Sequence, residues 1–333
     1  MTVGRGDCGP DPTDRSTLIE EVDLLREATG AVTLGRDVLR VSGADALAYL
    51  QGQLSQDVAA LAVGESADSL ILTPQGKLDA LVRVSRTGDD EVIIDVDGGF
   101  GEAVAARLAR FKLRVKVDIE ALAWGVVALR GPGSAAAAGV EDQAGTSLRA
   151  AFSWNGVSGV DLLGEAPAVP AAVRLCSEAA WESVRVEAGI PVMGAELDER
   201  TIAAEADLLD RAVSFTKGCY TGQELVARLD ARGNRVARHL RGLVIRGLAS
   251  VTGEAPGFEV VAPGAEVVFE GKVVGAVTSS AWSPRFNCPV ALAYVHRTVE
   301  PSSTVELRLG TPDTPDAGAL SVVDADVRAL PLR

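Results

Sequence analysis

The chain has 333 residues, of which 47% are apolar and 23% charged, and its formal net charge at pH 7 is −14. This length and composition predict two or three folded domains with sizeable cores, and they exclude a collagen-like, coiled-coil or largely disordered protein. The negative charge disfavours a dedicated binder of nucleic acids or anionic membranes, because such partners are repelled on average. We therefore expect neither DNA nor a membrane among its partners.

The sequence shows no pattern of a targeting signal and no closely spaced pair of cysteines. No stretch reaches the roughly 20 apolar residues of a membrane-spanning helix, and the first residues lack the apolar core of a secretory signal, so we expect a cytoplasmic protein. Four cysteines, Cys8, Cys176, Cys219 and Cys288, stand far apart, and only two histidines are present. This spacing predicts neither a disulfide framework nor a metal site.

The first 30 residues predict a mobile polar tail of about 15 residues and then a short helix. The helix should run from Thr17 to about Thr29, because Thr17 and Glu20 form a capping box and Gly30 supplies a stop. These residues form the first of three predicted segments, 1–30.

Residues 31–240 form the second predicted segment, in which strands and helices follow one another irregularly. This order favours an α+β region, here with two subdomains, over a regular parallel sheet. A hairpin turn at residues 74–77 precedes a strand from Leu78 to Arg86, and strict alternation from Phe111 to Ile119 predicts a strand with one apolar and one basic face. A further helix should span Glu178 to Ala188, ended by Gly189.

Residues 241–333 form the third predicted segment, a run of short β segments separated by Gly and Pro. This pattern predicts a compact β-barrel or sandwich of about 90 residues.

The densest chemistry lies in the run KGCYTGQE, from Lys217 to Glu224. Thr221 and Glu224 predict a capping box for the following helix, so that Cys219 lies just before the start of that helix. A thiol there would feel the positive helix end and the charge of Lys217, and both favour the thiolate. A buried cysteine in a tight turn is an equally good interpretation.

Six arginines follow this run: Arg228, Arg232, Arg235, Arg238, Arg241 and Arg246. Such a concentration in an acidic chain could hold a polyanion, such as a polyglutamate or a phosphate, through charge-assisted hydrogen bonds. An arginine-rich surface that pairs with the protein's own carboxylates explains the pattern equally well.

Two residues of the predicted helix 178–188 have the chemistry of a ring-binding site. Glu187 lies near the negative end of the helix, where a carboxylate gains nothing, and it could bind the paired N–H donors of a pterin-like ring. The indole of Trp181 could stack on such a ring. A salt bridge from Glu187 to Arg185 or Arg200 is the simpler alternative. Asp79, after the hairpin turn, could act as an acid or base if it faces a cleft.

Several of these segments together resemble the YgfZ-type folate-binding proteins, relatives of the glycine cleavage system T-protein. The similarity rests on KGCYTGQE with VAR and RG after it, and on four further segments that occur in the same order: LQGQLSQDV (50–58), LTPQGK (72–77), RVEAGIP (185–191) and VGAVTSSAWSP (274–284). It extends over nearly the whole chain from about residue 31.

The resemblance implies a T-protein-like three-part α+β fold around a central folate channel, with a C-terminal β-barrel. It implies a tetrahydrofolate-binding accessory factor in iron–sulfur protein assembly or repair, whose partners are a reduced folate and iron–sulfur assembly or client proteins. Its reactive thiol would be Cys219. The implied catalytic residues are Cys219, Lys217 and Asp79, and the implied folate-binding residues are Glu187, Trp181, Tyr220, Gln223 and Arg228, with no metal ligands.

Two alternatives remain open from the sequence. The first is a folate-dependent aminomethyltransferase-like enzyme with Asp79 as its acid or base, although KGCY belongs to the YgfZ branch and not to the T-proteins. The second is a non-catalytic docking protein with a vestigial folate channel. Alanines precede Glu205 where the family often has a proline, so this residue receives no role.

Overall fold

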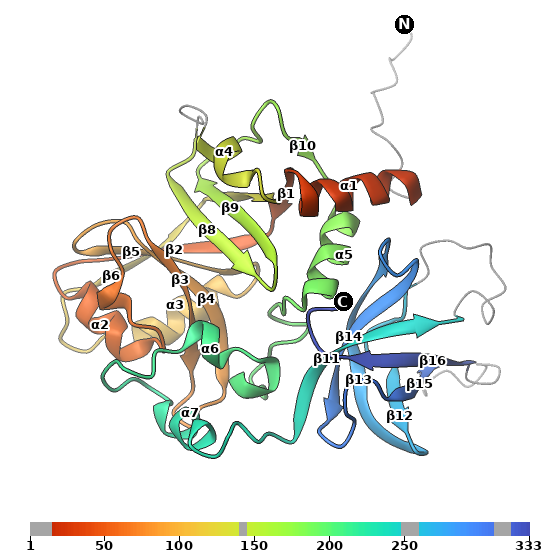
Figure 1. Ribbon diagram of the computed structural model, residues 1–333. Coiled ribbons are helices and arrows are strands. Elements are labelled where there is room, and N and C mark those ends of the chain that lie inside the picture. The colour runs from red at the N-terminus through yellow and green to blue at the C-terminus, as the bar shows by residue number, and fades with distance from the viewer. Residues whose placement is uncertain (1–14, 140–144, 248–259, 310–320) are drawn as a thin grey trace, which may run out of the picture.

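The computed structural model describes residues 15–139, 145–247, 260–309 and 321–333 (Figure 1). The predicted N-terminal tail and Cys8 lie outside these residues. The helices are α1 (Arg15–Glu27), α2 (Ala46–Gln53), α3 (Gly101–Arg110), α4 (Ser134–Gly139), α5 (Glu178–Ala188), α6 (Leu209–Ala212) and α7 (Gln223–Asp230). The strands are β1 (Gly30–Leu34), β2 (Arg36–Ser42), β3 (Ser66–Leu72), β4 (Leu78–Arg86), β5 (Glu91–Asp97), β6 (Asp118–Leu122), β7 (Gly125–Arg130), β8 (Leu148–Trp154), β9 (Val157–Gly164), β10 (Arg174–Leu175), β11 (Arg238–Arg246), β12 (Glu266–Phe269), β13 (Lys272–Ser283), β14 (Cys288–His296), β15 (Thr304–Leu309) and β16 (Ser321–Arg328).

The first sheet in the chain has the strand order β3-β4-β5-β2-β6, and every neighbouring pair in it is antiparallel. Alternate residues of its strands face opposite sides. Leu39 and Ile94 belong to the same core cluster as the apolar residues of α2 and α3, whereas Val38 and Ile93 pack against apolar residues of the second sheet. The sheet is therefore covered on both faces.

The second sheet has the order β10-β1-β7-β9-β8, in which only the short pair β1–β10 is parallel. Helix α5 follows β10 and begins where the Ser177 hydroxyl accepts a hydrogen bond from the Ala180 amide. It ends at Gly189, whose φ of 68° is the left-handed conformation that closes many helices. The predicted helix 178–188 is thus confirmed with its ends, and α1 confirms the first predicted helix to within two residues.

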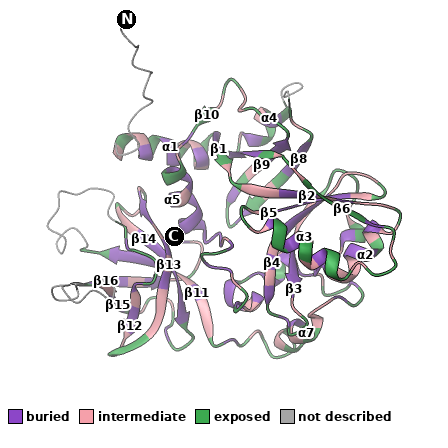
Figure 2. Ribbon diagram, turned by 180° about the vertical axis from the view of Figure 1, so that it is seen from behind, coloured by how far each residue is buried: buried purple, intermediate pink, exposed green. Residues whose placement is uncertain are grey.

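The C-terminal strands close into a barrel with the order β11-β14-β13-β12-β15-β16, which confirms the predicted barrel and the mixed α/β fold. One core cluster fills its interior. Residues on the outer side of β11, β13 and β14, among them Leu240, Trp282 and Leu292, belong to the large cluster of the rest of the chain. Figure 2 shows that residues are buried where the barrel meets α5.

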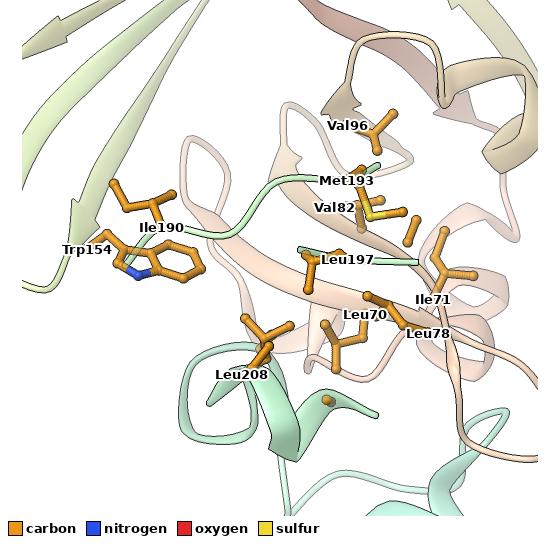
Figure 3. Packing of buried hydrophobic residues seen from close by; sticks show 14 of the residues in the cluster. Leu70, Ile71, Leu78, Val82, Val96, Trp154, Ile190, Met193, Leu197 and Leu208 are labelled. Atoms are coloured by element: carbon orange, nitrogen blue, oxygen red, sulfur yellow. The ribbon is translucent and has the colours of Figure 1, made fainter. Parts of the chain in front are cut away.

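The large cluster also connects the two sheets with the segments that follow α5. Figure 3 shows Leu70, Leu78 and Val82 of the first sheet near Leu197, with Trp154 of β8 beside Ile190. All of these side chains are buried.

The predicted strand from Phe111 to Ile119 is wrong over most of its length. Residues 111–117 form no strand, and β6 begins only at Asp118. Phe111 caps α3 and lies under the guanidinium of Arg107 at 4.0 Å, and Arg114 has a φ of 58° that breaks an extended chain. Leu113, which the alternation placed in the core, is 77% exposed.

Candidate functional site

A cavity of about 720 Å³ lies between the two sheets and α5. Its volume falls within the range of sites that hold a small molecule. Strands β1, β2, β4, β7, β8 and β9, helix α5 and the loop 190–193 all contribute to its lining. The aromatic part of the wall consists of Phe152, Trp154 and Trp181.

A chain of ion pairs forms the polar wall of this cavity and joins the two sheets. Arg83 of β4 donates to Asp95 of β5 at 2.9 Å and to Asp161 of β9 at 2.5 Å. Arg130 of β7 also binds Asp161, with Nη1 2.5 Å from the other carboxylate oxygen. Arg36 of β2 completes the chain by binding Asp95. Charged groups buried this deeply are tolerated because each one faces an opposite charge.

The electrostatics of this chain centre on Asp161. Its burial disfavours the carboxylate, but the guanidiniums of Arg130 and Arg83 outweigh that cost and lower the pKa of Asp161 to about 2. Burial in turn lowers the pKa of Arg130, although Asp161 opposes the shift.

Arg130 also contributes a buried polar atom without a partner to the cavity wall, as far as the structure describes the chain. Its guanidinium stacks on Phe152 at 3.8 Å and lies 5.1 Å from the ring centre of Trp181. Its Nε is buried and has no hydrogen-bond partner among the described residues. Trp181 meets Phe152 edge-on at 6.4 Å, so the aromatic wall and the charged wall touch at Arg130.

The loop that carries the motif cysteine is fastened to the end of α2 by Lys217. The Lys217 ammonium donates to the backbone carbonyls of Gln51, Leu54 and Gln56 at 2.7, 2.7 and 2.8 Å, which uses all three of its N–H donors. Burial lowers the pKa of Lys217 to about 8. The segment 50–58 and the motif, far apart in the sequence, thus form one structure.

Cys219 is exposed, whereas Cys176 is buried and Cys288 is intermediate. Cys176 lines the cavity, and burial raises the pKa of its thiol to about 11. Burial also raises the pKa of Cys288. Of the cysteines that the structure describes, Cys219 is the one that an external molecule reaches most readily. The residue after it, Tyr220, is buried beside Lys217, whose Nζ lies 5.2 Å from the ring centre, and burial raises the pKa of Tyr220 to about 12.

The predicted capping box of Thr221 and Glu224 is not formed. Helix α7 starts one residue later, after Gly222, and no side chain caps it. Gln223 instead accepts a hydrogen bond from the Tyr220 amide at 3.3 Å. Gly222 takes a φ of 83° because it packs on the hairpin turn, where an added Cβ would lie 2.6 Å from the Thr73 carbonyl oxygen.

Asp79 does not line the cavity. It lies at the start of β4, with its carboxylate 3.0 Å from Nε of Arg107. The same guanidinium donates to Gln53 at 3.2 Å and to the Leu72 carbonyl at 3.1 Å. Asp79 is therefore near the motif loop, because Gly52, next to Gln53, accepts a hydrogen bond from the Thr221 amide.

The two candidates on α5 are separated by the structure. Trp181 lines the cavity, but Glu187 does not. The Glu187 carboxylate lies 2.6 Å from the guanidinium of Arg26 in α1 and accepts a hydrogen bond from Ser283 of β13 at 2.7 Å. Glu187 thus joins α1, α5 and the barrel, and neither Arg185 nor Arg200 is its partner.

Arg228 lies on the exposed side of α7, also outside the cavity. It lines a second hollow, of about 560 Å³, together with Leu225, Leu229, Arg232 and Arg235. Glu205, to which no role was given, pairs with Arg238 at 3.0 Å.

The chain of ion pairs was not predicted from the sequence. Arg83, Asp95 and Asp161 each interrupt an apolar strand, and such a charge is a usable signal because a buried charge needs a partner. Their partners, however, are 12 to 78 positions away in the sequence. Elsewhere in the described residues, no group of three or more His, Cys, Asp or Glu is arranged to hold a metal, and no helix is long and apolar enough to cross a membrane.

Comparison with known proteins agrees with this architecture. Residues 238–315 match the family model of the glycine cleavage T-protein C-terminal barrel domain. The aminomethyltransferase of Corynebacterium jeikeium is 28% identical over 332 residues, covering 85% of this chain and 83% of that protein. An uncharacterized protein of Haemophilus influenzae is 28% identical over 198 residues, covering 59% of this chain and 66% of that protein.

A solved structure extends the likeness to the whole fold. The glycine cleavage system aminomethyltransferase T from Bartonella henselae superposes with a TM-score of 0.73 at 21% identity, covering 94% of this chain and 89% of that chain. The chain therefore has the glycine cleavage T-protein-like fold, including the C-terminal barrel of that superfamily.

Proposed function

We propose that this protein binds a reduced folate and serves as an accessory factor in the assembly or repair of iron–sulfur proteins, with Cys219 as its reactive thiol. The observation that carries the proposal is the exposed sulfur of Cys219 on a loop that Lys217 fixes to α2. A thiol kept accessible on an ordered loop suits contact with another macromolecule better than a role in packing. The role in iron–sulfur protein assembly or repair is inferred from the resemblance of the KGCYTGQE motif to the YgfZ-type proteins.

The cavity fits a reduced folate. Its volume of about 720 Å³ accommodates a bicyclic ring with its aromatic extension, and Trp181 and Phe152 offer flat apolar surfaces to that ring. The lining carries both guanidiniums and carboxylates, and a pterin edge presents both acceptors and N–H donors. Arg130 would contribute through the part of its side chain that lines the cavity, while its buried Nε has no hydrogen-bond partner among the described residues. When bound, the folate supplies the capacity to carry a one-carbon unit.

The test of the proposal separates the thiol from the cavity. In a strain that lacks this protein, wild-type chain should restore iron–sulfur enzyme activity, and Cys219→Ala should not. Calorimetry with tetrahydrofolate should give the same affinity for both, because Cys219 does not line the cavity. Cys288→Ala is the matched control and should restore activity. Full restoration by Cys219→Ala would refute the role of the thiol.

Similarity to aminomethyltransferases along most of the chain favours one alternative, a folate-dependent one-carbon transfer enzyme. Its acid or base would be Asp79. The Asp79 carboxylate pairs with Arg107 at 3.0 Å and does not line the cavity. It is therefore poorly placed to act on a folate bound there, which favours the accessory factor. Formation of methylene-tetrahydrofolate from tetrahydrofolate and an aminomethyl donor, lost in Asp79→Asn, would establish the alternative instead.

A further inference from the structure

The outer face of α7 forms a basic surface beside the motif loop. Leu225, Arg228, Leu229 and Arg232 recur at the spacing i, i+3, i+4 and i+7, so they lie along one side of α7 and the turn after it. With Arg235 they line the hollow of about 560 Å³. Helix α7 buries Val226, whereas its own Arg228 and the two arginines after it, Arg232 and Arg235, are exposed. We call these five residues the α7 basic face.

Among the described residues, the arginines of this face have no acidic partner. In the described parts of the chain, no carboxylate lies within ion-pair distance of Arg228, Arg232 or Arg235. By contrast, two later arginines of the same run are paired, Arg238 with Glu205 at 3.0 Å and Arg246 with Asp326 at 2.5 Å. Three neighbouring cations repel one another, and a chain with 46 acidic residues had many carboxylates to place among them. An external anion would relieve that repulsion.

The shape and lining of the hollow indicate which anion. Its charged groups are exposed side chains, and no buried polar group closes around an ion, so a small anion such as phosphate would be held weakly. Leu225 and Leu229 are half-buried and add apolar surface that a small anion does not use. An acidic polypeptide with an aliphatic side chain uses both. We propose that the α7 basic face is a docking surface for an acidic segment of a partner protein.

The position of this surface links it to the thiol, and here the inference rests on the proposed function. Helix α7 has eight residues and is about 12 Å long. Cys219 lies four positions before Gln223, the first residue of α7. An extended peptide rises about 3.3 Å per residue, so a docked segment of about five residues would run from the arginines to the level of Cys219. Docking would thus present the partner to the sulfur.

The test uses a reactive peptide and the full chain. The probe is a synthetic peptide of alternating glutamate and leucine, joined by a short glycine–serine linker to a chloroacetyl group. Attack by sulfur forms a carbon–sulfur bond and expels chloride, and the thiol proton passes to solvent. We expect labelling of Cys219, located by peptide mapping, to be about tenfold or more faster than with a lysine–leucine peptide of the same design, because docking raises the local concentration. Cys219→Ser should remove the label.

Charge reversal identifies the surface. The triple variant Arg228→Glu, Arg232→Glu, Arg235→Glu should lose the acceleration of the glutamate–leucine probe, and its reversed charge should speed labelling by the lysine–leucine probe instead. The matched control Arg110→Glu, Arg114→Glu, Arg297→Glu changes three exposed arginines elsewhere by the same charge and should keep the acceleration. The docking surface is refuted if the first variant labels as fast as the control, or if inorganic phosphate abolishes the effect at an ionic strength where sodium chloride does not. The labelling assay contains no folate. A failure of the protein to bind tetrahydrofolate, measured separately, would therefore overturn the proposed function and leave the docking surface standing.

Discussion

The side chain of Arg130 is 1% exposed, yet it lines the cavity. Asp161 compensates its charge, Phe152 covers one face of its guanidinium, and Nε has no partner in the described residues. A buried N–H donor that has no hydrogen-bond partner lowers the stability of the folded protein. The Nε of Arg130 lies beneath the surface of the cavity wall, so a ligand would reach this donor only after the side chain moves.

Trp181 gives the first prediction for a single residue. Trp181→Ala removes an aromatic wall of the cavity, so tetrahydrofolate affinity should fall about tenfold or more, whereas Trp181→Phe should retain most of it. Isothermal titration calorimetry measures both. Glu187→Gln serves as the control on the same helix, since Glu187 lies outside the lining. If Glu187→Gln weakens binding and Trp181→Ala does not, the pterin is bound elsewhere.

Lys217 gives the second prediction. Lys217→Met leaves three backbone carbonyls without their donor, so the free energy of unfolding should fall by about 2 to 4 kcal/mol. Urea unfolding of the variant measures the loss, and Lys272→Met, at an exposed site, should change it by less than about 0.5 kcal/mol. An unchanged midpoint for Lys217→Met would show that the ammonium does not hold the loop.

Between elements, the ion pairs of Asp161 connect the two sheets at the cavity wall. Arg83 comes from the first sheet, and Arg130 and Asp161 come from the second. Breaking a buried pair leaves an uncompensated charge, so Asp161→Asn should lower the free energy of unfolding by about 3 to 5 kcal/mol. Chemical denaturation at pH 7 measures this. Asp89→Asn, at a site 95% exposed, is the control.

The pH dependence of stability tests the same carboxylate. Its pKa is about 2 in the folded chain, against about 3.9 when unfolded, so the unfolded chain binds more protons in that interval. The stabilisation, about 2 to 3 kcal/mol, is fully present above pH 4 to 5 and is lost as the pH falls towards 2. The free energy of unfolding of Asp161→Asn should therefore fall less than that of the wild-type chain as the pH is lowered from 5 to 2. Parallel curves for the two proteins between pH 5 and 2 would contradict it.

The elements themselves differ in how far the sequence predicts them. Helix α5 was predictable with both ends because Ser177 and Gly189 act on neighbouring residues. The strand at 111–117 was mispredicted because apolar alternation does not reveal that Phe111 packs on Arg107 or that Arg114 has a positive φ. The cavity wall was missed for a related reason. Arg83 and Asp161 meet through the packing of two sheets, which no local pattern records.

At the scale of the whole molecule, the barrel is packed into the rest of the chain. Leu240, Trp282 and Leu292 on its outer side belong to the large core cluster, and the Leu332 amide donates to the Glu187 carbonyl at 2.7 Å. The barrel should therefore not unfold independently. Leu292→Ala, which cuts that interface, should lower stability by about 2 to 5 kcal/mol.

Two optical probes check this coupling. Tryptophan fluorescence and far-ultraviolet circular dichroism should give coincident urea transitions for the wild-type chain. Leu307→Ala, inside the barrel, should shift both transitions together. Separate midpoints for the two probes would show that the barrel and the sheets unfold as distinct units.

The contact between the hairpin turn and the start of α7 has a consequence for how this protein can diverge. An added Cβ on Gly76 would lie 2.4 Å from Cβ of Leu225 and 3.0 Å from the Gly222 oxygen, and one on Gly222 would strike the turn in return. Neither site has room for a larger residue while the other loop stays in place. Among descendants that keep this contact, the two positions, 146 apart in sequence, should be constrained as a pair, and a side chain gained at one should coincide with a rebuilt loop at the other.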